Sequence, residues 1–127
     1  SSDKTSIEEV KKEAHDFIQV LKSYTADHRD EAIQKSKAAL DELDTRVDVL
    51  EKRIEKNWDK MDKASRKNAR ASLDALRKRR AQVAEWYDRL KSSSADAWGH
   101  MQKGFSDAYG SLYDAWEKSE KEFGSNK

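Results

Sequence analysis

The sequence predicts an all-α protein, and three observations lead to that prediction. Apolar residues recur in alternating steps of three and four, and the clearest run is Leu40, Leu43, Val47, Leu50 and Ile54. Steps of this size keep side chains on one face of an α-helix. The 127 residues include no proline and only four glycines, the two residue types that helices tolerate least. Nearly half of the residues are Ala, Glu, Lys, Leu or Arg, a composition typical of long helices and coiled coils.

We therefore expect residues 1–127 to form a single helical domain. Its predicted architecture is an elongated antiparallel helical hairpin with an additional N-terminal helix, that is, a three-helix bundle or coiled coil. Charged residues make up 40% of the chain, but 26 basic and 25 acidic side chains nearly cancel. Disordered chains usually combine low hydrophobicity with a high net charge, so this balance favours a folded protein with a narrow apolar core.

The first helix is expected over residues 6–24. Ser6 and Glu9 have the spacing of a capping box, in which each side chain satisfies a backbone N–H at the start of a helix. Thr25 or Asp27 can then form a turn and cap the next helix. No glycine or proline enforces this break, so one bent continuous helix is the alternative. We favour the break.

The second helix is expected over residues 27–61 and the third over 66–121. The apolar rhythm fails in the polar stretch 62–68, which we interpret as a reversal of the chain. Three consecutive serines at 92–94 could interrupt the third helix. However, an exposed serine costs a helix less than about 1 kcal/mol, and the apolar stripe keeps its phase across the serines. We therefore favour a continuous third helix.

Charge is distributed unevenly between the two long helices. Residues 27–62 carry a net charge of −3 and residues 63–91 a net charge of +7, while residues 94–123 return to −3. An acidic helix followed by a basic one suits a self-complementary antiparallel pair. Folding the chain about residue 64 would place Leu50 beside Lys78.

A weak basic patch is the strongest local charge signal, and it consists of Arg77, Lys78, Arg79 and Arg80. Short basic runs can bind nucleic acids or anionic lipids. Consecutive helical residues point in different directions, and the predicted hairpin sets the patch across from Asp44, Asp48, Glu51 and Glu55. Because the whole chain carries a net charge of only +1, nucleic-acid binding is not favoured.

Residues 98–124 hold six of the eleven aromatic residues and all four glycines. On a helix, one face of this segment forms a candidate interaction face of Trp98, Met101, Phe105, Tyr109, Leu112, Trp116 and Phe123. Such a stripe can close a bundle, contact another copy of the chain or lie in a bilayer interface. Interfacial helices usually carry Lys and Arg, whereas this segment is acidic, so we expect core or oligomer contact. The glycines within this segment indicate close packing against another helix or an adaptable helix.

Four short segments of this tail place a small residue beside an aromatic one: Asp96-Ala97-Trp98, Lys103-Gly104-Phe105, Ala108-Tyr109 and Asp114-Ala115-Trp116-Glu117-Lys118. The pattern resembles the tail of small bacterial coiled-coil stress-response proteins, in which it follows a charged helical hairpin. The likeness covers residues 36–123. Similar eleven-residue Ala-aromatic periodicity occurs in exchangeable apolipoproteins and desiccation-protective proteins. The resemblance implies a non-enzymatic helical protein and brings no catalytic residues with it.

The motifs and spacings typical of most active sites are missing. There is no cysteine, and the three histidines lack the Glu-x-x-His or His-Glu-x-x-His spacing of metal sites. Gly-x-Ser-x-Gly and glycine-rich phosphate loops are absent as well. We therefore expect no enzymatic activity, no catalytic residue, no metal and no cofactor.

No apolar run is long enough to span a membrane, so we expect a soluble protein of the cytoplasm or periplasm. The chain starts at Ser1, which a cleaved signal peptide or a remnant of expression would explain. The predicted function is that of a structural or protective protein of the bacterial stress response or envelope. It would act through protein–protein contacts, as a homo-oligomer or with a helical partner. The alternative is reversible binding to a lipid or membrane surface through the C-terminal aromatic face.

Overall fold

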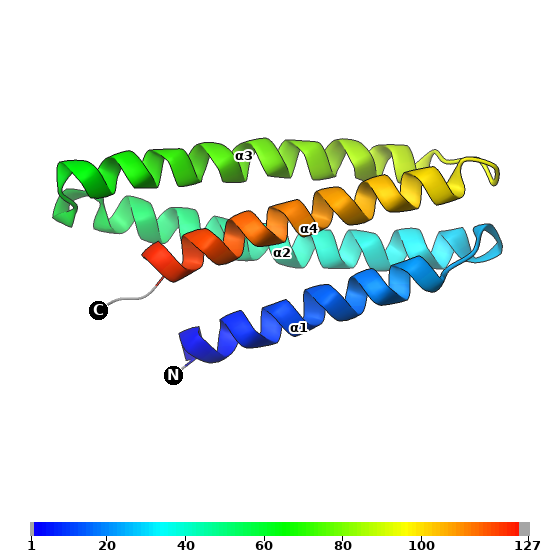
Figure 1. The fold of residues 1–127 in the computed structure, drawn as a ribbon, viewed down its shortest axis with the longest axis horizontal. Coiled ribbons are helices and arrows are strands. Elements are labelled where there is room, and N and C mark those ends of the chain that lie inside the picture. The colour runs from blue at the N-terminus through cyan, green and yellow to red at the C-terminus, as the bar shows by residue number, and fades with distance from the viewer. Residues whose placement is uncertain (1, 125–127) are drawn as a thin grey trace.

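Four α-helices that alternate in direction form the described part of the chain (Figure 1). The computed structural model describes residues 2–124, with side chains from residue 7 onward. The helices are α1 (Ser2–Ser23), α2 (Arg29–Asn57), α3 (Lys63–Lys91) and α4 (Trp98–Phe123). Two short 3₁₀ helices, η1 (Ala26–His28) and η2 (Trp58–Lys60), lie in the connections. The predicted all-α class is confirmed, and no strand occurs within residues 2–124.

The predicted continuous third helix over 66–121 is wrong, because α3 ends at Lys91 and α4 folds back along it. Two serine side chains form hydrogen bonds with the backbone at this break. Ser92 Oγ donates a hydrogen bond to the carbonyl of Asp88 at 3.0 Å, and Ser94 Oγ accepts one from the Ala97 N–H at 3.3 Å. Serine hydroxyls offer backbone groups such alternatives to helical bonding. The result is four packed helices rather than three.

The predicted break after the first helix is confirmed, although its capping is not. Thr25 has an extended backbone with φ −87° and ψ 173°. Neither η1 nor α2 has a hydrogen bond to a capping side chain at its N-terminus. The prediction that Thr25 or Asp27 caps the second helix is therefore wrong. The first helix begins at Ser2 rather than at residue 6. The side chain of Ser6 lies outside the described residues, and the capping box is therefore untested.

The chain reverses between α2 and α3, near the predicted stretch 62–68. Asp62 is the N-cap of α3, and its Oδ1 accepts a hydrogen bond from the Ser65 N–H at 2.8 Å. Because Asp62 caps the helix, α3 starts at Lys63, earlier than the predicted residue 66. The turn is reinforced by Arg66, whose Nε donates to the carbonyl of Trp58 at 3.1 Å. This end of the α2–α3 hairpin extends past the ends of α1 and α4 (Figure 1).

The apolar core runs the length of the bundle, and both α2 and α4 pack on all three other helices, α4 most extensively on α3. The predicted stripe of the second helix is confirmed as its core face. Its fully or nearly fully buried residues are Ala32, Ser36, Leu40, Leu43, Val47, Leu50 and Ile54. The buried residues of α3 are Ala69, Leu76, Val83 and Leu90. Burial of these side chains is what stabilises helices that carry so many charges.

Candidate functional site: the groove between α2 and α4

The candidate interaction face lies inside the bundle. Trp98, Phe105, Tyr109, Leu112 and Trp116 are buried, and Met101 and Phe123 are half-buried. The face therefore packs within one chain and is not presented to a partner or a lipid in this conformation.

Helix α1 provides much of the cover. Phe17 meets Tyr109 edge-on, with ring centroids 5.0 Å apart, and Phe105 at 6.3 Å. At the far end, Trp98 Nε1 donates a hydrogen bond to the carbonyl of Tyr24 at 3.0 Å. An aromatic ring that is both packed and hydrogen-bonded is a stable core element. The N-terminal helix thus closes the aromatic face that the sequence singled out.

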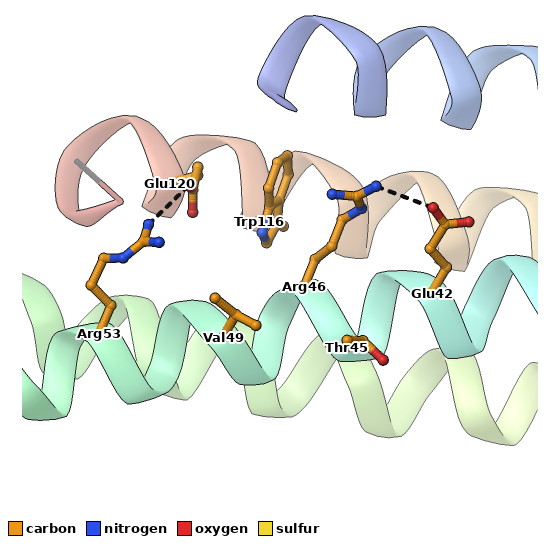
Figure 2. Close-up of a pocket in the computed structure, with 7 residues that line it drawn as sticks. All are labelled: Glu42, Thr45, Arg46, Val49, Arg53, Trp116 and Glu120. Carbon is orange, nitrogen blue, oxygen red and sulfur yellow. Dashed lines mark hydrogen bonds and ion pairs between the residues drawn. The ribbon is translucent and has the colours of Figure 1, made fainter. Parts of the chain in front are cut away.

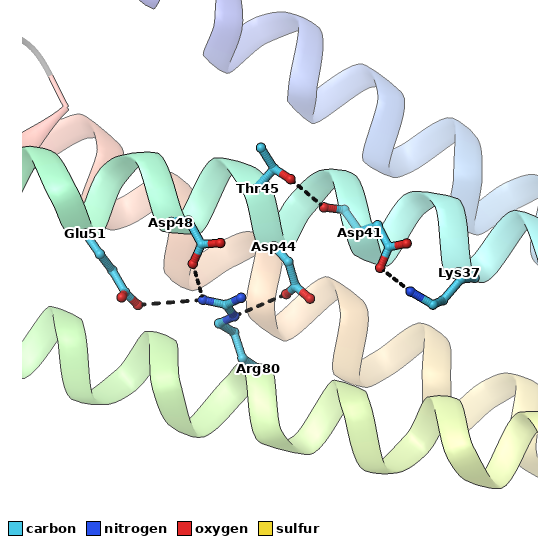
Figure 3. Close-up of polar contacts among 7 residues, drawn as sticks. All are labelled: Lys37, Asp41, Asp44, Thr45, Asp48, Glu51 and Arg80. Carbon is cyan, nitrogen blue, oxygen red and sulfur yellow. Dashed lines mark hydrogen bonds and ion pairs between the residues drawn. The ribbon is translucent and has the colours of Figure 1, made fainter.

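The basic patch is not one surface, because Arg80 is half-buried and points toward α2 (Figure 3), whereas its other members are exposed. Arg80 points toward α2, where its Nη1 lies 2.7 Å from Asp48 Oδ1 and its Nε lies 3.2 Å from Asp44 Oδ1. Glu51 Oε1 is 4.0 Å away. These contacts agree with the predicted acidic row opposite, although no contact of Arg80 with Glu55 occurs among the described residues. Burial raises the pKa of Asp44, and the charge of Arg80 opposes this shift.

The other three members of the patch, Arg77, Lys78 and Arg79, are exposed. The patch therefore divides into one arginine that joins α2 to α3 and three side chains in solvent. Surface charges of this kind contribute little to stability.

A groove of about 420 Å³ lies between α2 and α4 (Figure 2). Its lining residues are Glu42, Thr45, Arg46, Val49, Arg53, Trp116 and Glu120. The volume is within the range of ligand and peptide pockets. Val49 is 51% exposed, and together with the buried indole of Trp116 it makes the middle of the groove apolar.

Each end of the groove carries an arginine–glutamate pair. At one end, Arg46 Nη2 lies 3.1 Å from Glu42 Oε1. At the other, Arg53 Nη1 lies 3.3 Å from Glu120 Oε1 and also donates to the carbonyl of Gly124. Arg46 and Arg53 are seven residues apart on one helix, so they project from the same side of α2.

The polar groups of the groove are mixed, because Glu42 and Glu120 supply carboxylate acceptors beside the N–H donors of Arg46 and Arg53. Trp116 Nε1 is buried and has no hydrogen-bond partner in the structure, and it lies at the end of the ring nearer α2 (Figure 2). Both arginines make their ion pairs through a single terminal nitrogen, while a guanidinium has five N–H groups. A buried indole N–H normally finds an acceptor. The indole N–H of Trp116 is therefore an unsatisfied buried donor beside the groove.

The groove continues under α1 as a smaller cavity of about 140 Å³. There Val10, Glu13 and Phe17 of α1 lie against α2 and Tyr109 of α4. Burial, together with the charges of Glu42 and Glu13, raises the pKa of Tyr109 to about 12. Burial and the neighbouring Glu42 raise the pKa of Glu13 as well. Part of the cleft between α2 and α4 is thus already filled by a helix that carries an acidic residue.

The sequence analysis did not identify this groove. Val49 lies outside the apolar rhythm of α2, between the core positions Val47 and Leu50. An apolar residue on the polar face of a helix is the signal that could have marked the site. Its partner Trp116 was recognised only as part of the aromatic stripe, because a sequence does not show which edge of a buried ring borders the surface.

Within residues 7–124, no three His, Asp or Glu side chains are arranged to hold a metal ion. Among the described residues, no helix combines the length and the apolar character needed to cross a membrane. Comparisons with models of protein families, with curated proteins and with solved structures found no match to this chain.

Proposed function

We propose that this chain is a non-enzymatic structural or protective protein that acts through protein–protein contacts. The observation that supports the proposal is how the bundle uses its side chains. The large aromatic residues are packed inside, whereas the surface consists mainly of charged side chains, many in ion pairs one helical turn apart. Interspersed surface charges of both signs favour solubility, so contacts of the closed bundle with other macromolecules would be polar and reversible. The resemblance of the tail supports such a role in the bacterial stress response or envelope.

The alternative is binding to a lipid surface through the aromatic face of α4. That function would require α1 to leave α4, because Phe17 and Tyr24 cover the face in the closed bundle. The cost of exposing several large aromatic side chains to water favours the closed form. Protein–protein contact by the closed bundle is therefore the better-supported proposal.

A client-protection assay tests the proposal. An enzyme that aggregates on heating, such as citrate synthase, is heated alone, with this protein, or with an equal mass of serum albumin. We expect this protein to reduce light scattering more than albumin does, while its own helical circular dichroism is unchanged. Scattering equal to the albumin control, combined with cosedimentation of the protein with anionic vesicles, would contradict the proposal and support the lipid alternative.

A further inference from the structure

We infer that the hairpin tip binds the surface of an anionic lipid bilayer while the bundle stays closed. The hairpin tip is the segment 56–70, which contains the end of α2, all of η2 and the start of α3. Its outer part extends past the ends of α1 and α4 (Figure 1), so a flat surface can meet this end of the bundle first. The site is separate from the aromatic face of α4 and goes beyond the protein contacts of the proposed function.

Positive charge is concentrated in the hairpin tip. The segment holds six basic and two acidic side chains, whereas the other 112 residues hold 20 basic and 23 acidic ones. Clusters of about four to eight Lys and Arg residues are typical of segments that bind anionic lipids. The tip is thus a basic end on a chain whose remainder is slightly acidic. Its cations are Lys56, Lys60, Lys63, Arg66, Lys67 and Arg70.

None of these six cations is in an ion pair within residues 7–124. Arginines in the body of the bundle behave differently, because Arg46, Arg53 and Arg80 each pair with a carboxylate of another helix. Five of the six tip cations are exposed, and Arg66 is half-buried. Their charges are therefore available to an external anion.

The position of these cations is unfavourable for α3 itself. The N-terminal end of a helix carries a partial positive charge, so acidic side chains stabilise it and basic ones do not. The first turn of α3 has no acidic residue, and its first eight residues include Lys63, Arg66, Lys67 and Arg70. Helix stability does not account for four cations at this end, whereas binding to an anionic surface does.

Trp58 holds two of the cations in place. Arg66 Nε donates a hydrogen bond to the carbonyl of Trp58 at 3.1 Å, and Arg66 Cζ lies 5.5 Å from the centroid of the indole. Arg70 Cζ lies 5.1 Å from the same centroid. Two guanidinium groups are thus held at one ring with no carboxylate of the described residues paired to either. Because a guanidinium can donate two parallel hydrogen bonds to a phosphate, the phosphate of a lipid headgroup is a matching ligand.

The apolar side chains of the tip favour a bilayer over a nucleic acid. Trp58 and Met61 are half-buried in the connection between α2 and α3, and tryptophan is enriched at the interface between a bilayer and water. Single-stranded nucleic acids bind largely by stacking bases on aromatic rings, but Arg66 and Arg70 already lie over the Trp58 ring. A duplex lying along the bundle would also meet its acidic remainder, whereas a bilayer meets the tip alone.

Cosedimentation with vesicles tests the inference. The full chain is mixed with vesicles of phosphatidylcholine, or of phosphatidylcholine with phosphatidylglycerol, at several salt concentrations. The tip variant is Lys63→Glu with Lys67→Glu. The matched control is Lys35→Glu with Lys78→Glu, which changes the net charge equally at two other exposed lysines. Lys78 is about 22 Å from Lys63 along α3, and Lys35 lies farther away, near the opposite end of α2.

We expect binding to the anionic vesicles and none to the neutral ones, with an affinity that falls as salt screens the charges. The tip variant should bind at least about tenfold more weakly than the parent, because two attractive charges become repulsive. The control should stay within about twofold of the parent, since its charges lie beyond the screening length. Equal binding of the two variants, equal binding to both vesicles, or no binding at all would overturn the inference.

The stability of the tip variant excludes unfolding as the cause of lost binding. Its melting temperature should be no lower than that of the parent, because acidic side chains are favourable at the start of a helix. A structural role of Lys63 and Lys67 would instead lower the melting temperature. That result, with vesicle binding restored in conditions where the variant is fully folded, would also overturn the inference.

A fluorescent label reports which end of the bundle meets the bilayer. Because the chain has no cysteine, Ala64→Cys in the tip and Ala95→Cys can each carry one polarity-sensitive dye. Both alanines are exposed, and the connection between α3 and α4 that contains Ala95 lies at the opposite end of the bundle (Figure 1). Anionic vesicles should shift the emission of the first dye to the blue and leave the second unchanged. A shift of the second dye would show that the bundle does not bind by its tip.

Further arms of the experiment separate this inference from the other functions. Duplex and single-stranded DNA, at the same phosphate concentration, should bind more weakly than the anionic vesicles, and tighter binding of either would assign the tip to nucleic acid instead. Vesicle binding that the tip variant retains, with a changed emission of Trp98 and Trp116, would support the aromatic face. If the parent protects the client enzyme but does not bind vesicles, this inference is wrong and the proposed function stands. If vesicle binding is lost only in the tip variant and the client is not protected, the reverse holds.

Discussion

Gly104 determines how closely α3 and α4 approach each other. A Cβ atom at this position would lie 2.2 Å from Cζ3 of Trp86, so the indole occupies the space that a side chain would need. Arg89 lies over the same ring at 4.8 Å from its centroid, and His100 meets it at 5.7 Å. At Gly110, a Cβ would meet only Ile18 Cδ1 at an ordinary 3.8 Å. One glycine is thus required by packing and the other is not.

Alanine at these two glycines should have opposite effects on stability. Gly104→Ala should destabilise the fold by about 1–3 kcal/mol, because the Trp86 ring must move to admit a methyl group. Gly110→Ala should stabilise it by up to about 1 kcal/mol, because alanine loses less backbone entropy in a helix. Urea denaturation of the two variants measures both values, and each serves as the control for the other. Stabilisation by Gly104→Ala would show that Trp86 does not pack on α4.

Asp62 should make the stability of the hairpin depend on pH. The hydrogen bond from the Ser65 N–H lowers the pKa of the Asp62 carboxyl. A lowered pKa stabilises the fold above the unfolded-state value of about 3.9, and this contribution is lost as the pH falls through the folded-state pKa. Asp62→Asn keeps an N-cap acceptor that does not titrate, whereas Asp62→Ala removes the acceptor.

Melting temperatures at pH 7 and pH 3 check this prediction. Asp62→Ala should melt below the parent protein at pH 7 and approach it at pH 3. Asp62→Asn should remain close to the parent at pH 7 and lose less stability on acidification. A constant difference between the alanine variant and the parent at both pH values would mean that the carboxylate does not cap α3.

At the scale of the elements, much of the fold could be predicted from the apolar rhythm. The core face of α2 and the reversal near residue 62 both follow from the spacing of apolar residues along one helix. The break at residues 92–94 does not, because α3 and α4 each turn an apolar face toward the same core. Tyr87 and Trp98 are eleven residues apart, about three helical turns, so they keep phase whether or not the helix is interrupted. An interrupted and an uninterrupted helix therefore give the same apolar pattern, and only the packing of α4 on the other helices distinguishes them.

A cross-linking experiment checks the fold-back of α4. Asn68 of α3 and Lys118 of α4 line the same shallow groove between these helices. A continuous helix would separate them by about 75 Å. Cysteines introduced at both positions should therefore be joined within one molecule by a short bifunctional maleimide. A pair at Asn68 and Gly99, which lies near the opposite end of α4, is the control and should not be joined. Links found only between molecules would indicate an extended or exchanged α4.

At the scale of the whole molecule, the fold separates an internal aromatic surface from an external charged one. The sequence identified the aromatic residues, but periodicity alone could not show whether they meet α1, another copy or a lipid. The answer depends on tertiary contacts, such as Phe17 against Tyr109 and Trp98 against the carbonyl of Tyr24. The groove at Val49 was missed for the same reason, because it exists only where α1 stops following α2. The faces of α2 and α4 that are accessible in this bundle therefore depend on which surfaces α1 covers.

Tryptophan fluorescence tests whether the aromatic face stays closed. Trp58→Phe with Trp86→Phe leaves Trp98 and Trp116, both nearly fully buried, as the only emitters. In buffer, emission of this variant should be blue-shifted relative to the same protein in guanidinium chloride, and anionic vesicles should not change it. Adding Trp98→Ala should cost about 3–5 kcal/mol of stability, because a buried indole is removed. Emission that is red-shifted in buffer and turns blue with vesicles would mean that α1 opens and that the aromatic face binds lipid, which would favour the alternative function.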